Sequence, residues 1–458
     1  MQFHLQNLGL IRDAKIELGQ LTIVCGKNNT GKSYLTHSLY GALAFARRQD
    51  RFYIPKDAVD AFRERGFCSV NLVSVASKYW EGFCADEMHQ LSKSVPGLLG
   101  KPNVAISTLA INLDVGDLRS YVEGRLRRFS CDFPLKFNEG YSVQFTKKKD
   151  SEFIECKYVP TQAGLDIYQG VHIDVPDLAV ENTKWVVSYL ICQRLPRPFI
   201  IGSERTGISV FRDEFNFYRT LAYNEKGSEQ LDKLRERVLF NDYPIAVRKD
   251  LEFATQLSTV VKNKKSFLAD RQPLLQEFAS IAGGDYEVDS NSGLVSFHPN
   301  GSSERLSLRE SSSSVRSLCE LYFYFQYCAR RGDILIIDEP EMNLHPGAQR
   351  QLARFIAALL KQEIRVFITT HSDYLIREFN AMVRISKLDD ESQKVILQKY
   401  NYKKDSLVAD DDLRVYVVNA GGANPVSYDV EAKAFGVTSF DDTIETYNQL
   451  FTDIRNLD

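Results

Sequence analysis

The segment "LTIVCGKNNTGKSYLTHSLYGALAFA" at residues 21–46 constrains the fold more strongly than any other part of the chain. Its first five residues predict a buried strand, and leucines at every fourth position of residues 33–46 predict a helix with one apolar face. Two glycines separated by four residues stand between them, followed by a lysine and a serine. Because a glycine-rich turn before a helix N-terminus directs backbone N–H groups at an anion, the segment predicts an α/β fold with a phosphate-binding loop.

The same loop carries side chains suited to a nucleotide phosphate and a cation. Lys32 is expected to reach the β- and γ-phosphates, and the hydroxyl of Ser33 is expected to hold Mg²⁺. The residues of the loop that we expect to bind the nucleotide are Gly26, Asn28, Asn29, Thr30, Gly31, Lys32 and Ser33.

Length and composition narrow the class of protein. A chain of 458 residues exceeds the size at which one core stops growing, so two or three lobes are expected. The formal net charge of −3 argues against a surface that is basic overall. We find no run of 18 apolar residues and no signal-peptide core in residues 1–20, so we expect a cytoplasmic protein without a membrane span. The eight cysteines include no C-x-x-C pair, which predicts neither a zinc site nor a disulfide framework.

A second motif, "ILIIDEPEMNLHP" at residues 334–346, joins a buried strand to two acids. The acids follow the C-terminal end of the strand, where parallel sheets bind their ligands. Asp338 is expected to complete the Mg²⁺ shell opposite Ser33. Glu339 is a candidate catalytic residue that would orient or deprotonate an attacking water. Pro346 predicts the start of the next helix.

A third motif, "EIRVFITTHS" at residues 363–372, is another buried strand, and His371 lies at its end. A histidine in this place can donate a hydrogen bond to the γ-phosphate, which makes His371 the second candidate catalytic residue. Taken alone, a histidine at a strand end is more often a structural group. Its occurrence together with the loop and the acidic pair favours the catalytic role.

The three motifs resemble the ATPase heads of the SMC, RecF and OLD group of ABC-type ATPases. The resemblance implies an α/β fold, namely an ABC-type P-loop ATPase head with an antiparallel β subdomain and a short inserted helical arm, and it implies ATP and Mg²⁺ as cofactors. It also implies a head-to-head dimer, in which a signature serine of one chain reaches the γ-phosphate bound to the other. The matching stretch is "ESSSSVRSLCELYFYF" from residue 310, where Ser313 stands 25 residues before Asp338 and would act in trans.

The chain departs from this family pattern in two places. Ser314 stands where the family has a glycine, and because that glycine lets the backbone approach the phosphate, the side chain predicts slow or largely regulatory hydrolysis. A glutamine loop has only Gln162 and Gln193 as candidates. "PFIIGSERTGI" at residues 198–208 resembles a segment of bacterial defence ATPases, in which Arg205 would contact a phosphate or an interface, or would form a structural ion pair.

The motifs and the segments between them predict six regions and no nuclease site. About 60 residues, 401–458, follow the predicted head, too few for the Toprim domain of OLD-type nucleases, and the paired His and Asn of an HNH site are absent from the sequence. The expected regions are the N-terminal part of the head with the phosphate-binding loop (1–50), an insertion and the antiparallel β part (51–195), a core strand with its arginine segment (196–210), a helical insertion (211–283), the C-terminal part of the head with the signature, the acidic pair and the histidine (284–400), and C-terminal strands and a helix (401–458).

An ATPase head without its own nuclease resembles the PtuA ATPases of Septu anti-phage systems, which work with a separate HNH nuclease. The resemblance implies a homo-oligomer, at least a dimer, that hydrolyses ATP and regulates or scaffolds the nuclease, with DNA reached through the complex and no membrane partner. ATPases of PARIS defence systems share this plan. Two other classes stay open: a RecF-like DNA repair clamp, and a scaffold that binds ATP without hydrolysing it.

Overall fold

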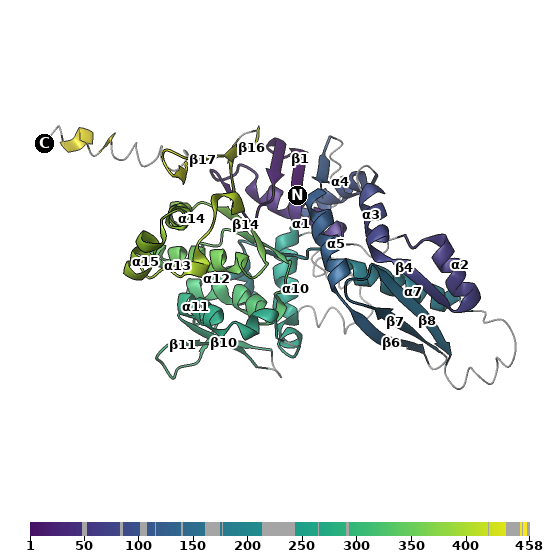
Figure 1. Ribbon diagram of the computed structural model, residues 1–458. Coiled ribbons are helices and arrows are strands. Elements are labelled where there is room, and N and C mark those ends of the chain that lie inside the picture. Colours follow the sequence, from purple (N-terminus) through teal and green to yellow (C-terminus); the bar gives the residue numbers. More distant parts are fainter. Residues whose placement is uncertain are drawn as a thin grey trace, which may run out of the picture. The chain divides into compact units, whose positions relative to one another are not determined.

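The chain forms two compact units in the computed structural model (Figure 1). The first unit comprises Met1, Ala42–Gln90 and Asn112–Arg197, and the second comprises Gln2–Gly41, Leu91–Ile111 and Pro198–Asp458. The residues that the structure describes are 1–47, 53–82, 86–100, 108–114, 116–138, 141–160, 175, 177–212, 243–263, 265–289, 293–419, 421–436, 449–450 and 452–455.

An antiparallel sheet with the strand order β4-β8-β7-β6 forms the centre of the first unit. Alternate residues of its strands are buried, among them Cys68 and Val70 in β4 and Ile154 and Cys156 in β8, as expected where one face of a sheet is covered. The alternating sequence at 141–159 correctly predicts the β7–β8 hairpin. The elements of this unit are α2 (Lys56–Arg65), β4 (Phe67–Asn71), α3 (Leu72–Gly82), α5 (Gly116–Arg128), β6 (Cys131–Asn138), β7 (Tyr141–Lys147), β8 (Phe153–Pro160) and α7 (Asp177–Cys192).

A mixed sheet with the order β5-β1-β2-β16-β15-β3-β14-β13-β9 forms the second unit, and its strands from β15 to β9 run parallel. Because parallel strands are buried on both faces, they appear in the sequence as continuous apolar runs rather than alternating ones. The strands are β1 (Gln2–Leu8), β2 (Ile11–Glu17), β3 (Leu21–Cys25), β5 (Ala110–Asp114, which begins in this unit), β9 (Pro198–Ile201), β13 (Ile334–Asp338), β14 (Arg365–Thr370), β15 (Leu413–Asn419) and β16 (Gly421–Val426), together with a small sheet of β10 (Gly284–Val288), β11 (Val295–Pro299) and β12 (Leu306–Ser307) and the pair β17 (Tyr428–Asp429) and β18 (Ala434–Phe435).

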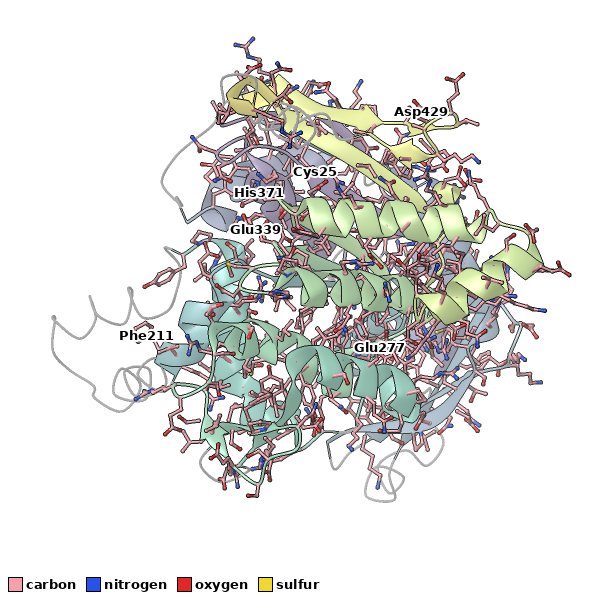
Figure 2. All side chains as sticks on the ribbon, turned by 90° about the vertical axis from the view of Figure 1, so that its left-hand side faces the viewer. Cys25, Phe211, Glu277, Glu339, His371 and Asp429 are labelled. Atoms are coloured by element: carbon pink, nitrogen blue, oxygen red, sulfur yellow. The ribbon has the colours of Figure 1, made fainter. Side chains whose placement is uncertain are left out.

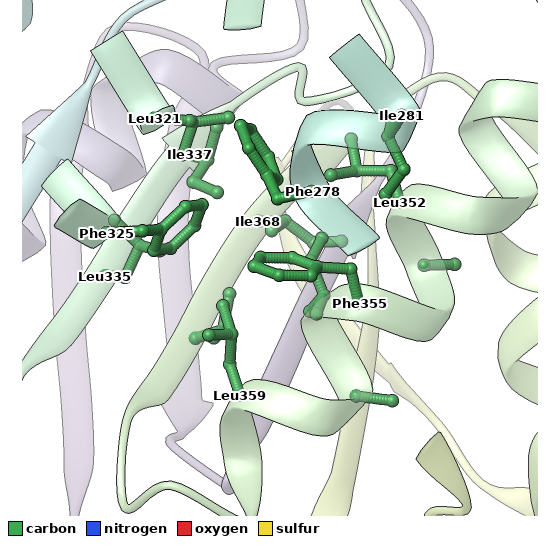
Figure 3. Packing of buried hydrophobic residues seen from close by; sticks show 14 of the residues in the cluster. Phe278, Ile281, Leu321, Phe325, Leu335, Ile337, Leu352, Phe355, Leu359 and Ile368 are labelled. Atoms are coloured by element: carbon green, nitrogen blue, oxygen red, sulfur yellow. The ribbon is translucent and has the colours of Figure 1, made fainter. Parts of the chain in front are cut away.

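Helices pack against the strands to form the apolar core of the second unit. Figure 3 shows aromatic rings from three segments packed together: the ring centroids of Phe278, Phe325 and Phe355 lie 4.9–5.0 Å apart. The helices are α1 (Lys32–Phe45, whose last residues belong to the first unit), α4 (Asp86–Leu98, which begins in the first unit), α10 (Ile245–Val260), α11 (Gln272–Ala282), α12 (Ser313–Phe323), α13 (Pro346–Leu360), α14 (Asp373–Ser386) and α15 (Asp390–Lys399), with 3₁₀ turns at Phe267–Asp270, Lys404–Ser406 and Asp410–Asp412 and a π-helical turn at Tyr324–Cys328.

The position of β15 corrects one expectation from the sequence. Residues 363–372 were expected to hold the last core strand, but β15 follows it and pairs in parallel with β3, with Val415 opposite Ile23. The strand that leads into the phosphate-binding loop is therefore flanked by β14 on one side and by β15 on the other. The sequence shows that 414–418 forms a strand, but not that it lies beside a segment from the other end of the chain.

The predicted α/β class is confirmed by the mixed sheet and its helices. Of the expected helical insertion at 211–283, α10 and α11 are described, whereas the charged stretch at 229–239 lies outside the described residues. Within the described ranges, no helix combines the length and the apolar character needed to cross a membrane.

Candidate nucleotide site

The loop between β3 and α1 has a backbone that only glycine can adopt at its first position. Gly26 has a φ of +148°, and a Cβ there would lie 2.4 Å from the carbonyl oxygen of Val418. Lys32 is 6% exposed, and its Nζ donates to the carbonyl oxygens of Gly26 (3.1 Å) and Lys27 (2.8 Å). Burial lowers the pKa of Lys32, and the neighbouring carboxylates oppose this shift. The loop thus holds a cation that is largely shielded from water.

The carboxylate of Asp338 lies at the centre of the site. The Ser33 hydroxyl donates to Asp338 Oδ2 at 2.9 Å, and the Thr369 hydroxyl donates to Asp338 Oδ1. These contacts follow from the sheet, because β13 pairs with β14 and β14 pairs with β3, so that the C-terminal ends of the three strands coincide. The hydroxyl and carboxylate oxygens are of the kind that Mg²⁺ prefers, so the two predicted metal ligands fit that cation in their chemistry.

Glu339 follows Asp338 in a left-handed backbone conformation, with a φ of +50°. Its N–H is placed within 3.2 Å of both the carbonyl oxygen and the hydroxyl of Thr369. Its side chain is about one-third exposed and lines the pocket described below. Burial raises the pKa of Glu339, and the neighbouring charge of Asp338 raises it further, so its carboxylate is a stronger base than an exposed glutamate.

His371 lies beside Glu339, as Figure 2 shows, with 3.5 Å between His371 Nε2 and Glu339 Oε1. Burial lowers the pKa of His371, and the positive charge of Lys32 lowers it further. The contact with Glu339 is therefore one between a neutral imidazole and a carboxylate at neutral pH, not an ion pair. The structure thus brings both predicted catalytic residues to one place.

Glu341 fixes the backbone at the end of β14, where Thr370 and His371 lie, and the sequence did not predict this role. Its Oε1 accepts from the backbone N–H of His371 at 2.7 Å and from the Thr370 hydroxyl at 2.8 Å. The residue is 9% exposed, and burial raises its pKa. Its place in the "EPE" turn is the one sequence signal that points to it.

These side chains surround a pocket of about 790 Å³. Three of its residues had no predicted role: Gly9 and Leu10, in the turn between β1 and β2, and Tyr34, which follows Ser33 in α1. Gly9 touches the Tyr34 ring so closely that a Cβ would lie 2.5 Å from the ring. No feature of the sequence distinguishes this contact. The lining consists of Gly9, Leu10, Asn28, Asn29, Thr30, Gly31, Lys32, Ser33, Tyr34, Glu339 and His371.

Arg205 does not occupy the role expected of it. Its guanidinium is 1% exposed and donates to backbone carbonyl oxygens, namely those of Gly202 (2.7 Å), Ser317 (3.0 Å), Asp338 (2.9 Å) and Glu339 (2.7 Å). Neither the ion pair nor the phosphate contact expected from the sequence accounts for these bonds.

Ser313 is not among the residues that line the pocket. Ser313 is exposed at the first position of α12, where the Ser312 hydroxyl caps the helix by accepting from the Val315 N–H. Gln162 lies outside the described residues, and Gln193 follows α7 in the first unit. β13 lies between β14 and β9, and the turn after β9, at 202–205, contains no glutamine.

Comparison with known proteins gives a family match and a set of distant structures. Residues 206–377 match the family described as "AAA domain, putative AbiEii toxin, Type IV TA system", a range that includes the acidic pair and His371 but not the phosphate-binding loop. No curated protein matches the sequence. One similar solved structure is an SMC head bound to the C-winged helix domain of ScpA, with 11% identity and a TM-score of 0.37 over 94% of this chain and 98% of that chain. A second is an SMC head with an extended coiled coil bound to the C-terminal domain of ScpA from Pyrococcus furiosus, with 11% identity and a TM-score of 0.35 over 97% of this chain and 98% of that chain. A third is the SMC head domain from Thermotoga maritima, with 10% identity and a TM-score of 0.29 over 93% of this chain and 98% of that chain. The matched range of 172 residues is less than half of the chain.

Proposed function

We propose that the chain binds ATP with Mg²⁺ in this pocket and hydrolyses it slowly. The observation that carries the proposal is the 2.9 Å contact between Ser33 Oγ and Asp338 Oδ2 at the edge of a pocket of about 790 Å³. In this proposal the loop residues Gly26, Asn28, Asn29, Thr30 and Gly31 surround the phosphates, to which the loop backbone offers N–H groups. Mg²⁺, held by Ser33 and Asp338, would neutralise charge on the phosphate oxygens.

The other pocket residues have separate roles in this proposal. Lys32 releases its two carbonyl partners and binds the β- and γ-phosphates. Glu339, whose pKa is raised by burial, orients the attacking water and accepts its proton. His371 is neutral because burial lowers its pKa, so it donates a hydrogen bond to the γ-phosphate instead of forming an ion pair.

The proposal includes a head-to-head dimer. Ser313 is exposed at the start of α12, where backbone N–H groups and the helix dipole favour an anion. A partner chain that faces this helix end with its own bound ATP would receive the Ser313 hydroxyl in trans. The Ser314 side chain, in place of glycine, is the reason that we propose slow hydrolysis.

We further propose that the chain is the ATPase subunit of a two-component anti-phage complex and regulates a separate HNH-type nuclease. This part rests on the sequence resemblance to Septu ATPases and on the matched family, whose description names the toxin of a two-part toxin–antitoxin system. DNA would be reached through the complex.

Replacing Glu339 with Gln tests the ATPase. The variant should retain ATP affinity and lose hydrolysis about 100- to 10,000-fold, as expected for removal of a general base, and it should accumulate as an ATP-bound dimer. The readouts are phosphate release, calorimetric binding of ATP with Mg²⁺, and mass by light scattering. Glu391→Gln is the matched control, since Glu391 lies exposed on α15. Equal turnover in Glu339→Gln and wild type would refute the assignment, and ATP binding without any wild-type turnover would indicate a scaffold.

Co-purification tests the partner. The tagged chain is expressed with the protein encoded beside it, and the mass of the product is measured with and without ATP and Mg²⁺. We expect a stable complex with a nuclease. An ATP-dependent dimer that binds DNA alone, with an affinity that falls steeply with salt, would instead favour the RecF-like clamp.

A further inference from the structure

The bonds of Arg205 join three separate parts of the second unit. Gly202 belongs to the turn after β9, Ser317 lies in α12, Asp338 ends β13, and Glu339 follows it. Arg205 donates to a carbonyl oxygen in each of these places, over distances of 2.7–3.0 Å. The four contacts use all three guanidinium nitrogens, and an arginine can do this because its donors are fixed in one plane and point in different directions. A lysine, with one nitrogen, cannot reach all of these carbonyls at once.

The surroundings of Arg205 are built to retain a cation away from water. The residue is 1% exposed. Asp250 of α10 lies close by and accepts from the Gly202 N–H at 3.0 Å, so the turn after β9 is held from both its N–H and its carbonyl sides. A Cβ at Gly202 would lie 2.8 Å from Asp250 Oδ2, which shows how closely α10 approaches this turn. A buried charge is expensive unless hydrogen bonds compensate it, and the guanidinium of Arg205 makes four of them to carbonyl oxygens.

The contact with Glu339 has the most direct consequence for the site. A non-glycine residue with a φ of +50° is strained, and this conformation persists only where its surroundings enforce it. Arg205 holds the carbonyl of Glu339 at 2.7 Å, and Thr369 accepts from its N–H. Both peptide groups that flank the Glu339 side chain are therefore fixed by buried partners, and this directs the carboxylate into the pocket.

We propose that Arg205 is a positioning residue that fixes the backbone of Glu339 and links it to α12, the helix that begins at Ser313. The inference rests on the proposed function, because it assigns to Arg205 the placement of the base in that same site. Arg205 reaches α12 through Ser317, one turn after Ser313, so a displacement of α12 is carried to the carbonyls of Asp338 and Glu339. Arg205 itself does not line the pocket.

Replacing Arg205 with Lys separates positioning from a merely structural role. A structural role would lower stability but leave the folded fraction with normal turnover. A positioning role instead predicts that folded Arg205→Lys binds ATP within about threefold of wild type while its kcat falls about 10- to 100-fold, since small misplacements of a catalytic group have effects of this size. Arg354→Lys is the matched control: Arg354 is also largely buried, but it pairs with Glu378, which is not a pocket residue. Its kcat should stay within twofold of wild type.

The outcomes distinguish the two proposals. Absence of ATP binding by wild type would overturn the proposed function and this inference with it. Two results would overturn the inference alone, provided that wild type hydrolyses ATP. The first is an unchanged kcat in folded Arg205→Lys, and the second is a loss of ATP affinity in this variant that equals its loss of kcat. Should Arg205→Lys fail to fold, hydrogen exchange on wild type decides. Addition of a slowly hydrolysed ATP analogue with Mg²⁺ should change protection in 313–323 and 338–342 together, and a change confined to 26–33 would refute the link.

Discussion

Replacing Gly26 with Ala tests whether the phosphate-binding loop depends on its contact with β15. A Cβ at position 26 would lie 2.4 Å from the carbonyl oxygen of Val418, whereas contacts under 3.0 Å are essentially never seen. Because this neighbour is backbone within a sheet strand, it cannot rotate away. The φ of +148° adds strain of about 1–3 kcal/mol for a residue with a side chain, and forcing extra volume into a packed site adds about 1–3 kcal/mol more. We therefore expect the variant to lose about 2–6 kcal/mol of unfolding free energy.

Urea unfolding measures the loss, and the position of the tryptophans helps to assign it. Both tryptophans, Trp80 and Trp185, belong to the first unit, so their fluorescence reports on that unit, whereas far-ultraviolet circular dichroism reports on both. Gly207→Ala is the matched control, since a Cβ there would meet nothing within 4 Å in an exposed helical turn of the second unit. The control should be neutral or slightly stabilising. If Gly26→Ala stayed within about 0.5 kcal/mol of wild type, a change typical of a neutral surface substitution, and bound ATP normally, the packing argument would be wrong.

Three further predictions address the site and the core. Thr369→Val removes the hydroxyl that donates to Asp338, and a hydrogen bond to a charged group is worth about 1.5–3 kcal/mol. Mg²⁺-dependent ATP binding, measured by calorimetry, should therefore weaken about 10- to 100-fold. An unchanged Mg²⁺ requirement would contradict this prediction. Burial raises the pKa of Glu339, so the rate of hydrolysis should begin to fall at a higher pH than it would with an ordinary glutamate as the base. A pH–rate profile whose decline in acid occurs at the pKa of an ordinary glutamate would argue against Glu339 as the base. Phe355→Ala should cost about 3–5 kcal/mol of unfolding free energy in urea, because the ring is fully buried against Phe278 and Phe325; a loss under about 1 kcal/mol would show that the core refills the cavity.

Parts of the fold that rest on local patterns could be predicted from the sequence. β3 was predicted with the bounds that the structure shows, and α1, β13 and α13 begin within one residue of their expected positions. These elements are readable because buried parallel strands leave continuous apolar runs, and because helices leave apolar residues at every third or fourth position. The meeting of Ser33, Asp338 and His371 was predictable for the same reason, since each follows a strand of that kind.

Contacts between distant segments could not be predicted in this way. The carbonyl partners of Arg205 are backbone atoms, and one of them lies 134 residues away, so no side-chain pattern points to them. Burial of the guanidinium, which excludes the phosphate contact, is a property of the packed unit alone. The contact of Gly9 with Tyr34 and the place of β15 beside β3 depend in the same way on pairing across the fold.

The place of β15 also bears on how the protein is synthesised. β3 and its loop leave the ribosome early, but the strand that completes the sheet beside them is translated roughly 390 residues later, which at about 5–20 residues per second is on the order of 20–80 s. Until then one edge of β3 has no partner, and the carbonyl of Val418 that packs against Gly26 does not yet exist. A nascent chain should therefore acquire its nucleotide only after β15 has been translated, and ribosome-bound chains that stop before residue 413 should not be retained on an ATP resin.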